Sequence, residues 1–334
     1  MPEPSTAPVL ALDLGASRIR AAVVGPDGRI LARRDGRTPG ADGPAAVVEA
    51  CIAHLRAVRD DAGRDLAARL AGVGLSAPGP VDPRAGTLVE PPNIGPGFRD
   101  VAFAAPIGAA LGLPAALERD THVAALAELA FGAARGCRDF LYITVSTGFG
   151  GAIVVDGRLY GGPDGVAGEL GHLPVDLDGP PCACGGRGHI EAICSGSGIA
   201  RLATAAAREG RSPDLAARLA ARAPGPLEGR DVAEAAEAGD PTASAILERA
   251  RQAFAALVVG LVNVLAPERI VVGGSLAAAQ GERLLGPARD AVRESAFRIP
   301  RERVSIVPAA LGDDVGLAGA VPLLALATVG ARAG

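Results

Sequence analysis

The chain has 334 residues, 49% of them hydrophobic, so it can bury a large core, and its length predicts two domains. Its formal net charge of -4 gives no basic footprint for nucleic acid. All 33 basic residues are Arg, and without Lys the chain can form neither a Schiff base nor a Walker-type phosphate loop.

The sequence also contains no segment that predicts export or membrane insertion. No stretch approaches about 20 uninterrupted apolar residues, and the opening M-P-E-P-S-T-A-P has no charged leader before an apolar core. The five cysteines are an odd number, and two of them lie too close together to bridge easily, which argues against a disulfide framework. We therefore expect a cytoplasmic protein with no membrane partner.

The first segment predicts successive antiparallel hairpins. Residues 9–14, V-L-A-L-D-L, form a buried strand by run length, 15–18 form a turn, and a second apolar run follows at 19–24. Asp13 ends the first strand, where its carboxylate can hold Mg²⁺ through water while backbone N–H groups of the turn meet phosphate. A purely structural strand and turn is the alternative, since this arrangement occurs in many folds.

The next segment alternates helices and strands. Helical periodicity covers 44–69, a strand covers 73–76, and P-P-N-I at 91–94 is a turn in which Asn93 is either a binding residue or a turn former. A short helix ends near Leu113, and a strand at 115–120 leads into a helix over 121–131. Asp120 stands at this junction, where the structural role of an Asp is that of a helix N-cap.

Two glycine turns, far apart in the chain, each follow an apolar strand. The second, S-T-G-F-G-G at 146–151, lies between strands at 140–144 and 152–155. Backbone N–H groups of such a turn can cradle phosphates, and Thr147 adds a hydroxyl. Either turn alone is weak evidence for a phosphate site.

The loop after the second turn contains a set of metal-ligating residues. His172, Cys182, Cys184 and His189 supply two imidazoles and two thiolates, a complete tetrahedral set for structural zinc, and the glycines between them let a short loop wrap one ion. A flexible loop with two incidental thiols is the alternative. Glu169 and Glu191 bring carboxylates to the same loop, and these acceptors suit the hydroxyls of a polyol.

The rest of the chain is mainly helical. Helices are predicted over 198–208 and, after a Pro/Gly-rich break at 223–229, over 241–265 with Asp240 as N-cap. A strand at 270–272 precedes the turn G-G-S-L at 273–276, another strand covers 304–308, and a last helix starts near Val315.

Together these motifs resemble the ROK family of repressors, open reading frames and kinases. The residues that carry the resemblance are S-T-G-F-G-G, then G-E-L-G-H, then C-A-C-G-G-R-G-H-I-E, and it covers nearly the whole chain. It implies a two-lobed α/β fold of the actin-like ATPase type with a cleft between the lobes. We expect lobes at 1–118 and 119–314, with the last helix, about 315–334, packing on the first.

The resemblance assigns roles to the residues singled out above. Asp120 would be the catalytic base. Substrate-binding residues would be Asn93, Arg119, Glu169, His172 and Glu191. ATP with Mg²⁺ would contact Asp13, Gly15, Ser17, Arg18, Thr147, Gly148, Gly150, Gly273 and Gly274. Zn²⁺ would be held by His172, Cys182, Cys184 and His189, with His189 in place of the family's third Cys.

The chain departs from the family pattern at several points. Where the family reads D-[IL]-G-G-T-K, Ala16 replaces the second glycine, Ser17 the Thr and Arg18 the Lys. Where the family reads N-D-A-N, Arg119 replaces the first Asn, and Thr121 and His122 replace Ala-Asn. The family also often has a Trp whose place Phe98 can take.

The resemblance implies phosphorylation of a hexose by ATP, with O6 of glucose first. N-acetylhexosamine, mannose and fructose remain open as substrates, as does a degenerate sugar-binding protein without catalysis. Family repressors carry an N-terminal helix-turn-helix, for which the first strand at Val9 leaves no room, so we expect no nucleic-acid partner. We also expect a homodimer or a higher homo-oligomer.

Overall fold

The computed structural model of the chain describes residues 7–91 and 93–332. Pro92 of the P-P-N-I motif and the last two residues of the final predicted helix lie outside the described residues. The described residues divide into two compact units. The first comprises those among Met1–Arg138, Ile153–Ala167 and Ala310–Gly334, and the second comprises Asp139–Ala152 and Gly168–Ala309. The expected boundaries at 118 and 314 therefore differ from those of the compact units.

The first unit is built on a five-stranded sheet of order β3-β2-β1-β4-β8. Its strands are β1 (Val9–Leu14), β2 (Arg18–Val24), β3 (Ile30–Arg37), β4 (Val73–Ala77) and β8 (Ala115–Arg119). The first three strands form the two antiparallel hairpins that the sequence predicts, while β1 pairs with β4 and β4 with β8 in parallel. The carboxyl ends of β1, β4 and β8 therefore lie at one edge of the sheet.

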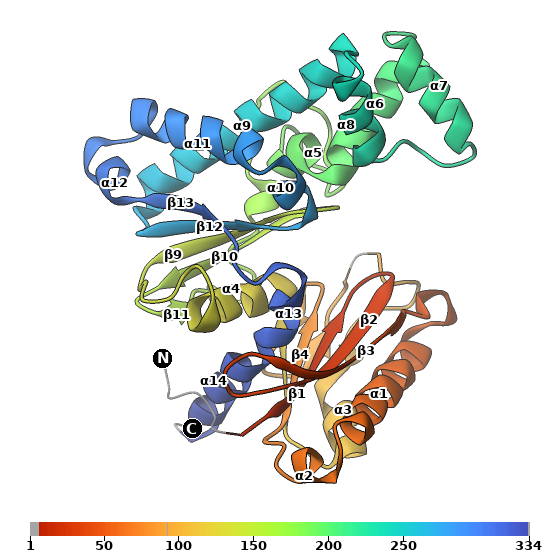
Figure 1. Cartoon of the computed structure of the whole chain (residues 1–334), viewed down its shortest axis with the longest axis vertical. Helices are drawn as coiled ribbons and strands as arrows, with labels where there is room; N and C mark the ends of the chain where they lie inside the picture. Colours follow the sequence, from red (N-terminus) through yellow and green to blue (C-terminus); the bar gives the residue numbers. More distant parts are fainter. Residues whose placement is uncertain (1–6, 92, 333–334) are drawn as a thin grey trace. The chain divides into compact units, whose positions relative to one another are not determined.

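Helices cover both faces of this sheet (Figure 1). On one face lie α1 (Pro44–Asp61) and α3 (Ala104–Leu111), and on the other lie α13 (Val315–Ala318) and α14 (Ala320–Arg332). Because strand side chains alternate, Leu10 and Leu12 join the core beneath α1, whereas Val9 and Ala11 join the core beneath α13 and α14. Asp13 continues the second series, so its carboxylate faces α13.

The remaining elements of the first unit are short, apart from α4. They are η1 (Gly40–Asp42), α2 (Arg64–Ala67), β5 (Val81–Asp82), β6 (Thr87–Leu88), β7 (Val101–Ala102), α4 (Asp120–Phe131), β11 (Arg158–Leu159) and η3 (Gly312–Asp314). The helical segment predicted over 44–69 is divided at Gly63, whose φ of +86° is left-handed. β5, β6 and β7 form a separate antiparallel sheet.

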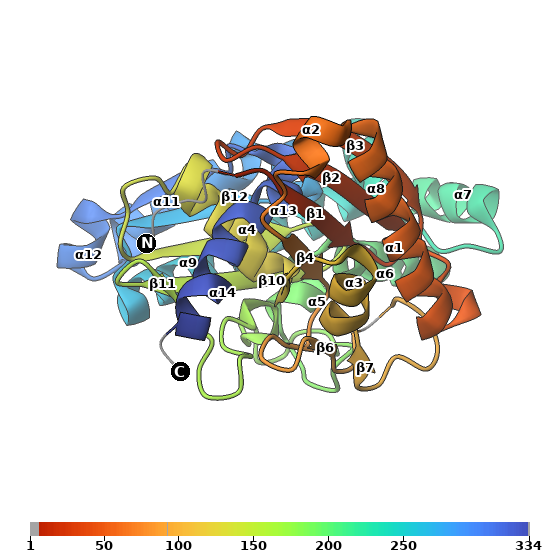
Figure 2. The ribbon, with the colours of Figure 1, turned by 90° about the horizontal axis from the view of Figure 1, so that it is seen from below.

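α4 belongs to the first unit because it packs on α13 and α14, and Figure 2 shows α14 beside it. Glu128 of α4 is fully buried, and its carboxylate accepts three backbone N–H groups, from Ala133 at 2.6 Å, Ala310 at 2.9 Å and Leu311 at 3.0 Å. A buried carboxylate requires such partners. Glu128 therefore holds the end of α4 to the segment that leads into α13.

The second unit combines most of a second sheet with a group of helices. The order of this sheet is β11-β10-β9-β12-β13. Its strands other than β11 are β9 (Phe140–Val145), β10 (Phe149–Val155), β12 (Arg269–Gly273) and β13 (Ser305–Pro308). The helices are η2 (Leu170–His172), α5 (Ile190–Cys194), α6 (Gly196–Arg208), α7 (Pro213–Arg222), α8 (Gly229–Glu237), α9 (Pro241–Leu265), α10 (Ser275–Gln280), α11 (Glu282–Ser295) and α12 (Arg298–Arg303).

The long helix α9 organises the second unit. It packs against α5, α6, α8 and α11, and its buried Phe254 lies 6.3 Å, ring centroid to centroid, from Phe149 of β10. α9 begins as the sequence predicts, with Asp240 as N-cap and Pro241 as its first residue. Asp240 Oδ1 accepts the N–H of Ala243 at 2.7 Å, and Oδ2 accepts the hydroxyl of Ser212 at 2.6 Å. Ser212 itself caps α7 by accepting the N–H of Leu215.

Replacing Asp240 with Ala is expected to lower the free energy of unfolding by about 1–2 kcal/mol, because one cap is lost and the hydroxyl that holds the other loses its acceptor. Denaturant unfolding followed by far-UV circular dichroism measures this difference. Asp240→Asn, which keeps the capping oxygen, is the matched control. An Ala variant as stable as the Asn variant would show that the cap contributes nothing.

The same cap predicts a pH dependence. Burial acts to raise the pKa of Asp240, but hydrogen bonds from Ser212 and from the backbone of Ala243 and Thr242 outweigh it and lower the pKa below its ordinary value. A depressed native pKa stabilises the fold above the unfolded-state pKa, and this contribution is lost as the pH falls through the native value. The Asn variant should lack this acid-dependent loss.

Among residues 7–91 and 93–332, none of the helices has the length and apolar character needed to cross a membrane.

Candidate active site and metal centre

The sheet edge of the first unit brings together two of the predicted acidic residues. Asp13 lies opposite Ser76 across β1 and β4, Ser76 lies opposite Glu118 across β4 and β8, and Asp120 follows directly after β8. In α/β sheets with parallel strands, ligands bind at the carboxyl ends of the strands. The edge that carries Asp13 and Asp120 is therefore the candidate site of this unit.

Asp13 is enclosed by polar partners. It is 6% exposed, its Oδ1 accepts the hydroxyl of Ser76 at 3.0 Å, and its Oδ2 accepts an N–H from the guanidinium of Arg20, with which it forms an ion pair. Gly316 of α13 closes the third side, because a Cβ at that position would lie 2.9–3.1 Å from the carboxylate atoms. Both carboxylate oxygens of Asp13 are thus already hydrogen bonded.

The turn after β1 is exposed and held from one side. Gly15 donates its N–H to the carbonyl of Arg18 at 2.8 Å, and Thr38 donates its hydroxyl to the carbonyl of Gly15 at 2.7 Å and its N–H to that of Ser17 at 3.1 Å. The side chains of Ala16, Ser17 and Arg18 are exposed. The predicted phosphate turn therefore exists as a fixed loop that presents its outer side to solvent.

The structure corrects the N-cap role considered for Asp120. Arg119, not Asp120, is the N-cap residue of α4, and its side chain makes no capping bond. Asp120 is the first helical residue and is exposed, with Oδ1 accepting the N–H of Thr121 at 2.7 Å. A carboxylate in the first turn of a helix interacts favourably with the positive end of the helix dipole.

The residues that depart from the family pattern around Asp120 are buried. Arg119 is 4% exposed, and its guanidinium donates to the carbonyl oxygen of Ala167 in the same unit. His122 is 2% exposed, and its Nδ1 lies 3.1 Å from the carboxylate of Glu118, which also accepts the N–H of Arg119. Glu118 and His122 thus bracket Asp120 from both sides along the chain.

Asn93 occupies a turn, and its φ of +67° is in the left-handed region where Asn is tolerated. Its side chain is exposed, whereas Phe98 is buried in the core beneath α1 and α3. The turn-former role considered for Asn93 is therefore real, and it leaves the side chain accessible to a ligand.

In the second unit, two predicted nucleotide turns lie side by side. β9 and β12 are parallel and pair Thr144 with Gly273, so both turns leave the same sheet edge. The hydroxyls of Ser146 and Ser275, one from each turn, lie 2.8 Å apart. Gly274 is required here, because its φ is +94° and a Cβ would lie 2.4 Å from the carbonyl oxygen of Val145.

The turn at residues 146–151 also contacts the start of α6. Gly196 and Ser197 donate their N–H groups to the carbonyls of Ser146 and Thr147 at 2.8 and 3.0 Å. The side chain of Thr147 stays exposed, and Gly148 and Gly150 continue into β10 beside it. These glycine turns form a second group of predicted residues, separate in the chain from the first-unit group.

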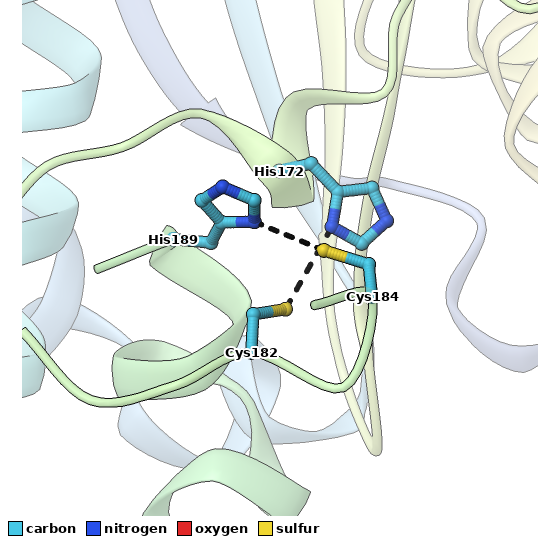
Figure 3. Close-up of side chains that lie close together, drawn as sticks. All are labelled: His172, Cys182, Cys184 and His189. Atoms are coloured by element: carbon cyan, nitrogen blue, oxygen red, sulfur yellow. Dashed lines mark hydrogen bonds between the residues drawn. The ribbon is translucent and has the colours of Figure 1, made fainter. Parts of the chain in front are cut away.

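The four predicted metal ligands converge on one point (Figure 3). The ligating atoms of His172, Cys182, Cys184 and His189 all lie within 4.8 Å of one another. Nδ1 of His172 is 3.8 Å from Sγ of Cys182, and Nδ1 of His189 is 3.3 Å from Sγ of Cys184. In the described residues, no other group of three or more His, Cys, Asp and Glu side chains has this geometry.

The geometry of this cluster fits a tetrahedral zinc ion. Zn–N and Zn–S bonds of about 2.0 and 2.3 Å place neighbouring ligand atoms roughly 3.3–3.8 Å apart. The two contacts above fall in this range. Burial raises the pKa of the Cys182 thiol, which favours the neutral thiol where no cation is bound.

Glycines make room for the cluster. A Cβ on Gly186 would lie 2.2 Å from Cε1 of His189, and one on Gly171 would lie 2.2 Å from the carbonyl oxygen of Phe149. The loop closes through a bridge between Pro174 and His189 and through the hydrogen bond from Val175 to the carbonyl of Gly188. The G-H pair of G-E-L-G-H is therefore fixed by packing against β10.

The carboxylates of the loop are oriented differently. Glu169 is exposed, and its Oε2 lies 4.0 Å from Nε2 of His172, the nitrogen that does not face Cys182. Glu191, in the first turn of α5, accepts the N–H of Phe149 at 3.1 Å. Glu191 is thereby anchored to the turn that contains Thr147, while the side chain of Glu169 is exposed.

The predicted site residues thus form three groups. Asp13, Gly15, Ser17, Arg18, Asn93, Arg119 and Asp120 belong to the first unit, and in the second unit the nucleotide turns and the metal loop are joined through Glu191. The prediction did not include Arg20, Ser76 and Gly316, which surround Asp13. The hairpin register offered a signal for Arg20, because a pair seven residues apart across a short turn lies on the same face.

Comparisons with known proteins extend over nearly the whole chain. The model of the ROK family matches residues 9–327. The glucokinase of Halalkalibacterium halodurans is 33% identical over 313 residues, which cover 93% of this chain and 92% of that protein. The N-acetylmannosamine kinase of Escherichia coli O157:H7 is 32% identical over 318 residues, covering 94% and 97%. A ROK glucokinase from Streptomyces griseus, solved with glucose and AMPPNP, is 32% identical with a TM-score of 0.76, covering 95% of this chain and 99% of that one.

Proposed function

Because the chain belongs to the ROK family, we propose that it is an ATP-dependent sugar kinase that transfers the terminal phosphoryl group of ATP to a hexose, with O6 of glucose as the first candidate acceptor. Its α/β architecture is that of the ROK sugar kinases, which have the actin-like ATPase fold. The observation that carries the proposal is the placement of exposed Asp120 at the sheet edge that also carries the phosphate turn of β1.

Asp120 is proposed to orient the sugar hydroxyl and to take its proton. The transition state of phosphoryl transfer is loose, so positioning and charge neutralisation contribute more than the strength of the base. The first turn of α4 holds Asp120 by a backbone hydrogen bond from Thr121. This bond favours an acceptor that is fixed before the hydroxyl arrives.

ATP is proposed to bind through the glycine turns. Backbone N–H groups after β1 and around Thr147 would contact phosphates, and the Gly273–Gly274 turn would let the adenosine approach the backbone. Mg²⁺ would enter with the phosphates, since it is usually held by substrate phosphates and one or two carboxylates. Because Ser76 and Arg20 already bind Asp13, this carboxylate would reach Mg²⁺ through water.

The sugar is proposed to be held by Asn93, Glu169, His172 and Glu191. Their amide, carboxylate and imidazole groups supply directional partners for hydroxyls. The metal loop would keep three of them in place: Zn²⁺ would be held by His172, Cys182, Cys184 and His189, with Nε2 of His172 directed away from Cys182 toward Glu169. A structural zinc ion supplies folding energy to such a loop.

A second substrate class is favoured by one comparison. The similarity to an N-acetylmannosamine kinase, at nearly the same identity as to a glucokinase, keeps N-acetylhexosamines as candidate acceptors. Mannose and fructose remain further candidates. Cytoplasmic localisation and a homo-oligomeric state stay predictions.

Restoring the family's Asn at Arg119 is expected to change the sugar preference, by about 10-fold or more in the ratio of kcat/KM values between two sugars. The guanidinium of Arg119 donates a hydrogen bond to the carbonyl of Ala167, two residues before Glu169. A shorter side chain would lose this bond and release this segment of the loop. Small displacements at a sugar site change discrimination by about 1–3 kcal/mol. The measurement is kcat/KM across a sugar panel, with Arg135→Asn as control on an exposed arginine of the same unit. An unchanged profile would remove Arg119 from substrate selection.

The proposed function itself is tested by a coupled ADP-release assay with Mg-ATP and a panel of hexoses and N-acetylhexosamines. Turnover on glucose, or on one favoured sugar, would establish the kinase and its substrate together. If a folded, zinc-containing protein released no ADP with any sugar, the degenerate sugar-binding alternative would replace the kinase.

A further inference from the structure

The ion pair of Asp13 and Arg20 is a partly buried feature of the candidate site, and the proposed function assigns no catalytic role to Arg20. The two residues lie directly opposite each other on β1 and β2, one pair away from the end of the hairpin. Arg20 also donates to the carbonyl oxygen of Asp313 at 2.6 Å. These contacts fix the guanidinium at the base of the turn that is expected to meet phosphate.

The pair leaves Arg20 with unused hydrogen-bonding capacity. A guanidinium has five N–H donors, and two of those of Arg20 have partners among the described residues. Its side chain is 29% exposed, against 9% for the side chain of Asp13. Each carboxylate oxygen of Asp13 already has one donor, while Arg20 can donate to a further anion.

The charge composition of the chain suggests which anion the remaining N–H donors of Arg20 bind. The chain contains no Lys, so a fixed side-chain cation near the transferred phosphoryl must be an Arg. A guanidinium matches the geometry of phosphate oxygens, and an arginine placed on a transferring phosphoryl group accelerates transfer by about 10³–10⁵-fold in other phosphoryl-transfer enzymes. Asp13 would act through Arg20 by holding it in place.

We propose that Arg20 is a catalytic residue whose guanidinium, held by Asp13, binds the terminal phosphate of ATP and neutralises its charge during transfer. This inference rests on the proposed kinase function. In the step, the bond from the terminal phosphorus to ADP breaks, and ADP leaves with the electron pair. The bond to the sugar oxygen forms, and the hydroxyl proton passes to Asp120.

The first test compares binding of two nucleotides by calorimetry, using AMPPNP, an ATP analogue with a terminal phosphate, and ADP, which lacks that phosphate. Arg20→Ala is expected to weaken AMPPNP by about 10-fold or more and ADP by less than about 3-fold, because the lost bonds go to the terminal phosphate. Arg34→Ala removes an exposed guanidinium that is paired with Asp61 in the same unit. This variant should change the affinity for neither AMPPNP nor ADP. Equal weakening of both nucleotides by Arg20→Ala would overturn the proposal.

The second test measures turnover. Arg20→Ala should lower kcat about 100- to 1000-fold with KM for the sugar nearly unchanged, and added guanidinium ions should restore part of the rate. The double variant Asp13→Asn/Arg20→Ala should lose less than the product of the two single losses, because Asp13 holds Arg20 in addition to reaching Mg²⁺ through water. Additive losses without rescue would make the pair structural.

Two controls keep these results interpretable. Arg20→Gln retains a side chain that can donate to Asp13, so if the Ala variant fails to fold, the Gln variant should still show the selective loss of AMPPNP. Absence of kinase activity in the unmodified chain would reject the proposed function, whereas the nucleotide comparison would still test Arg20.

Discussion

Replacing Asp120 with Ala is expected to lower kcat by about 10³-fold or more while sugar binding survives. General-base groups contribute about 10²–10⁴-fold, and a group that also orients the hydroxyl contributes through positioning as well. Asp120 is exposed and lies in the first turn of α4, so its removal should leave the rest of the helix intact. The measurements are ADP release at saturating substrates and sugar affinity by calorimetry.

Two further variants make this prediction specific. Asp120→Asn keeps the size and the hydrogen bond of the side chain but cannot accept the proton, so it should be nearly as slow as the Ala variant. Asp65→Asn changes an exposed Asp of α2 in the same unit and should leave kcat unaltered. Turnover that persists in both Asp120 variants would exclude this residue from the mechanism.

Replacing Cys184 with Ser is expected to abolish stoichiometric zinc binding and to unfold the loop around residues 172–189. Apparent zinc-binding free energies of about 10–16 kcal/mol drive folding of small zinc sites, so loss of one of four ligands removes a large stabilising contribution. Zinc content by atomic emission and the rate of limited proteolysis in the loop measure both effects. Cys194→Ala, which removes a fully buried thiol whose pKa burial raises to about 12, is the control.

The geometry around His189 sharpens the zinc prediction. Gly186→Ala should also lose zinc, because the added Cβ would occupy the space of the imidazole. His189→Cys should keep zinc, since it restores the ligand set of the family. Purified protein without stoichiometric zinc, or a Cys184→Ser variant that retains it, would contradict the metal site.

Local patterns in the sequence predicted much of the fold. The run V-L-A-L-D-L became β1, the Asp-Pro pair at 240–241 began α9, and the spacing of His and Cys residues brought four ligands to one point. Each of these depends on neighbours within a short stretch of chain. The strand, the helix cap and the metal-binding loop can therefore be predicted without the tertiary structure.

The surroundings of the candidate residues were not predictable in the same way. Gly316 contacts the carboxylate of Asp13 although the two residues are 303 positions apart in the sequence. No local sequence pattern indicates this contact. The burial of Arg119 against Ala167 likewise depends on a loop that the sequence places only by its turns. Compact units are set by such long-range packing, which explains why α4 groups with the first unit rather than the second.

The first unit is assembled from segments that are far apart in time during synthesis. β1 and β2 leave the ribosome well before α13 and α14, which cover Val9, Ala11 and Ala22. At about 5–20 residues per second, the roughly 170 residues between Arg138 and Ala310 take on the order of 10 to 30 seconds to translate. During that interval the apolar face of β1 and β2 stays uncovered, so this surface is where we expect a nascent chain to need a chaperone.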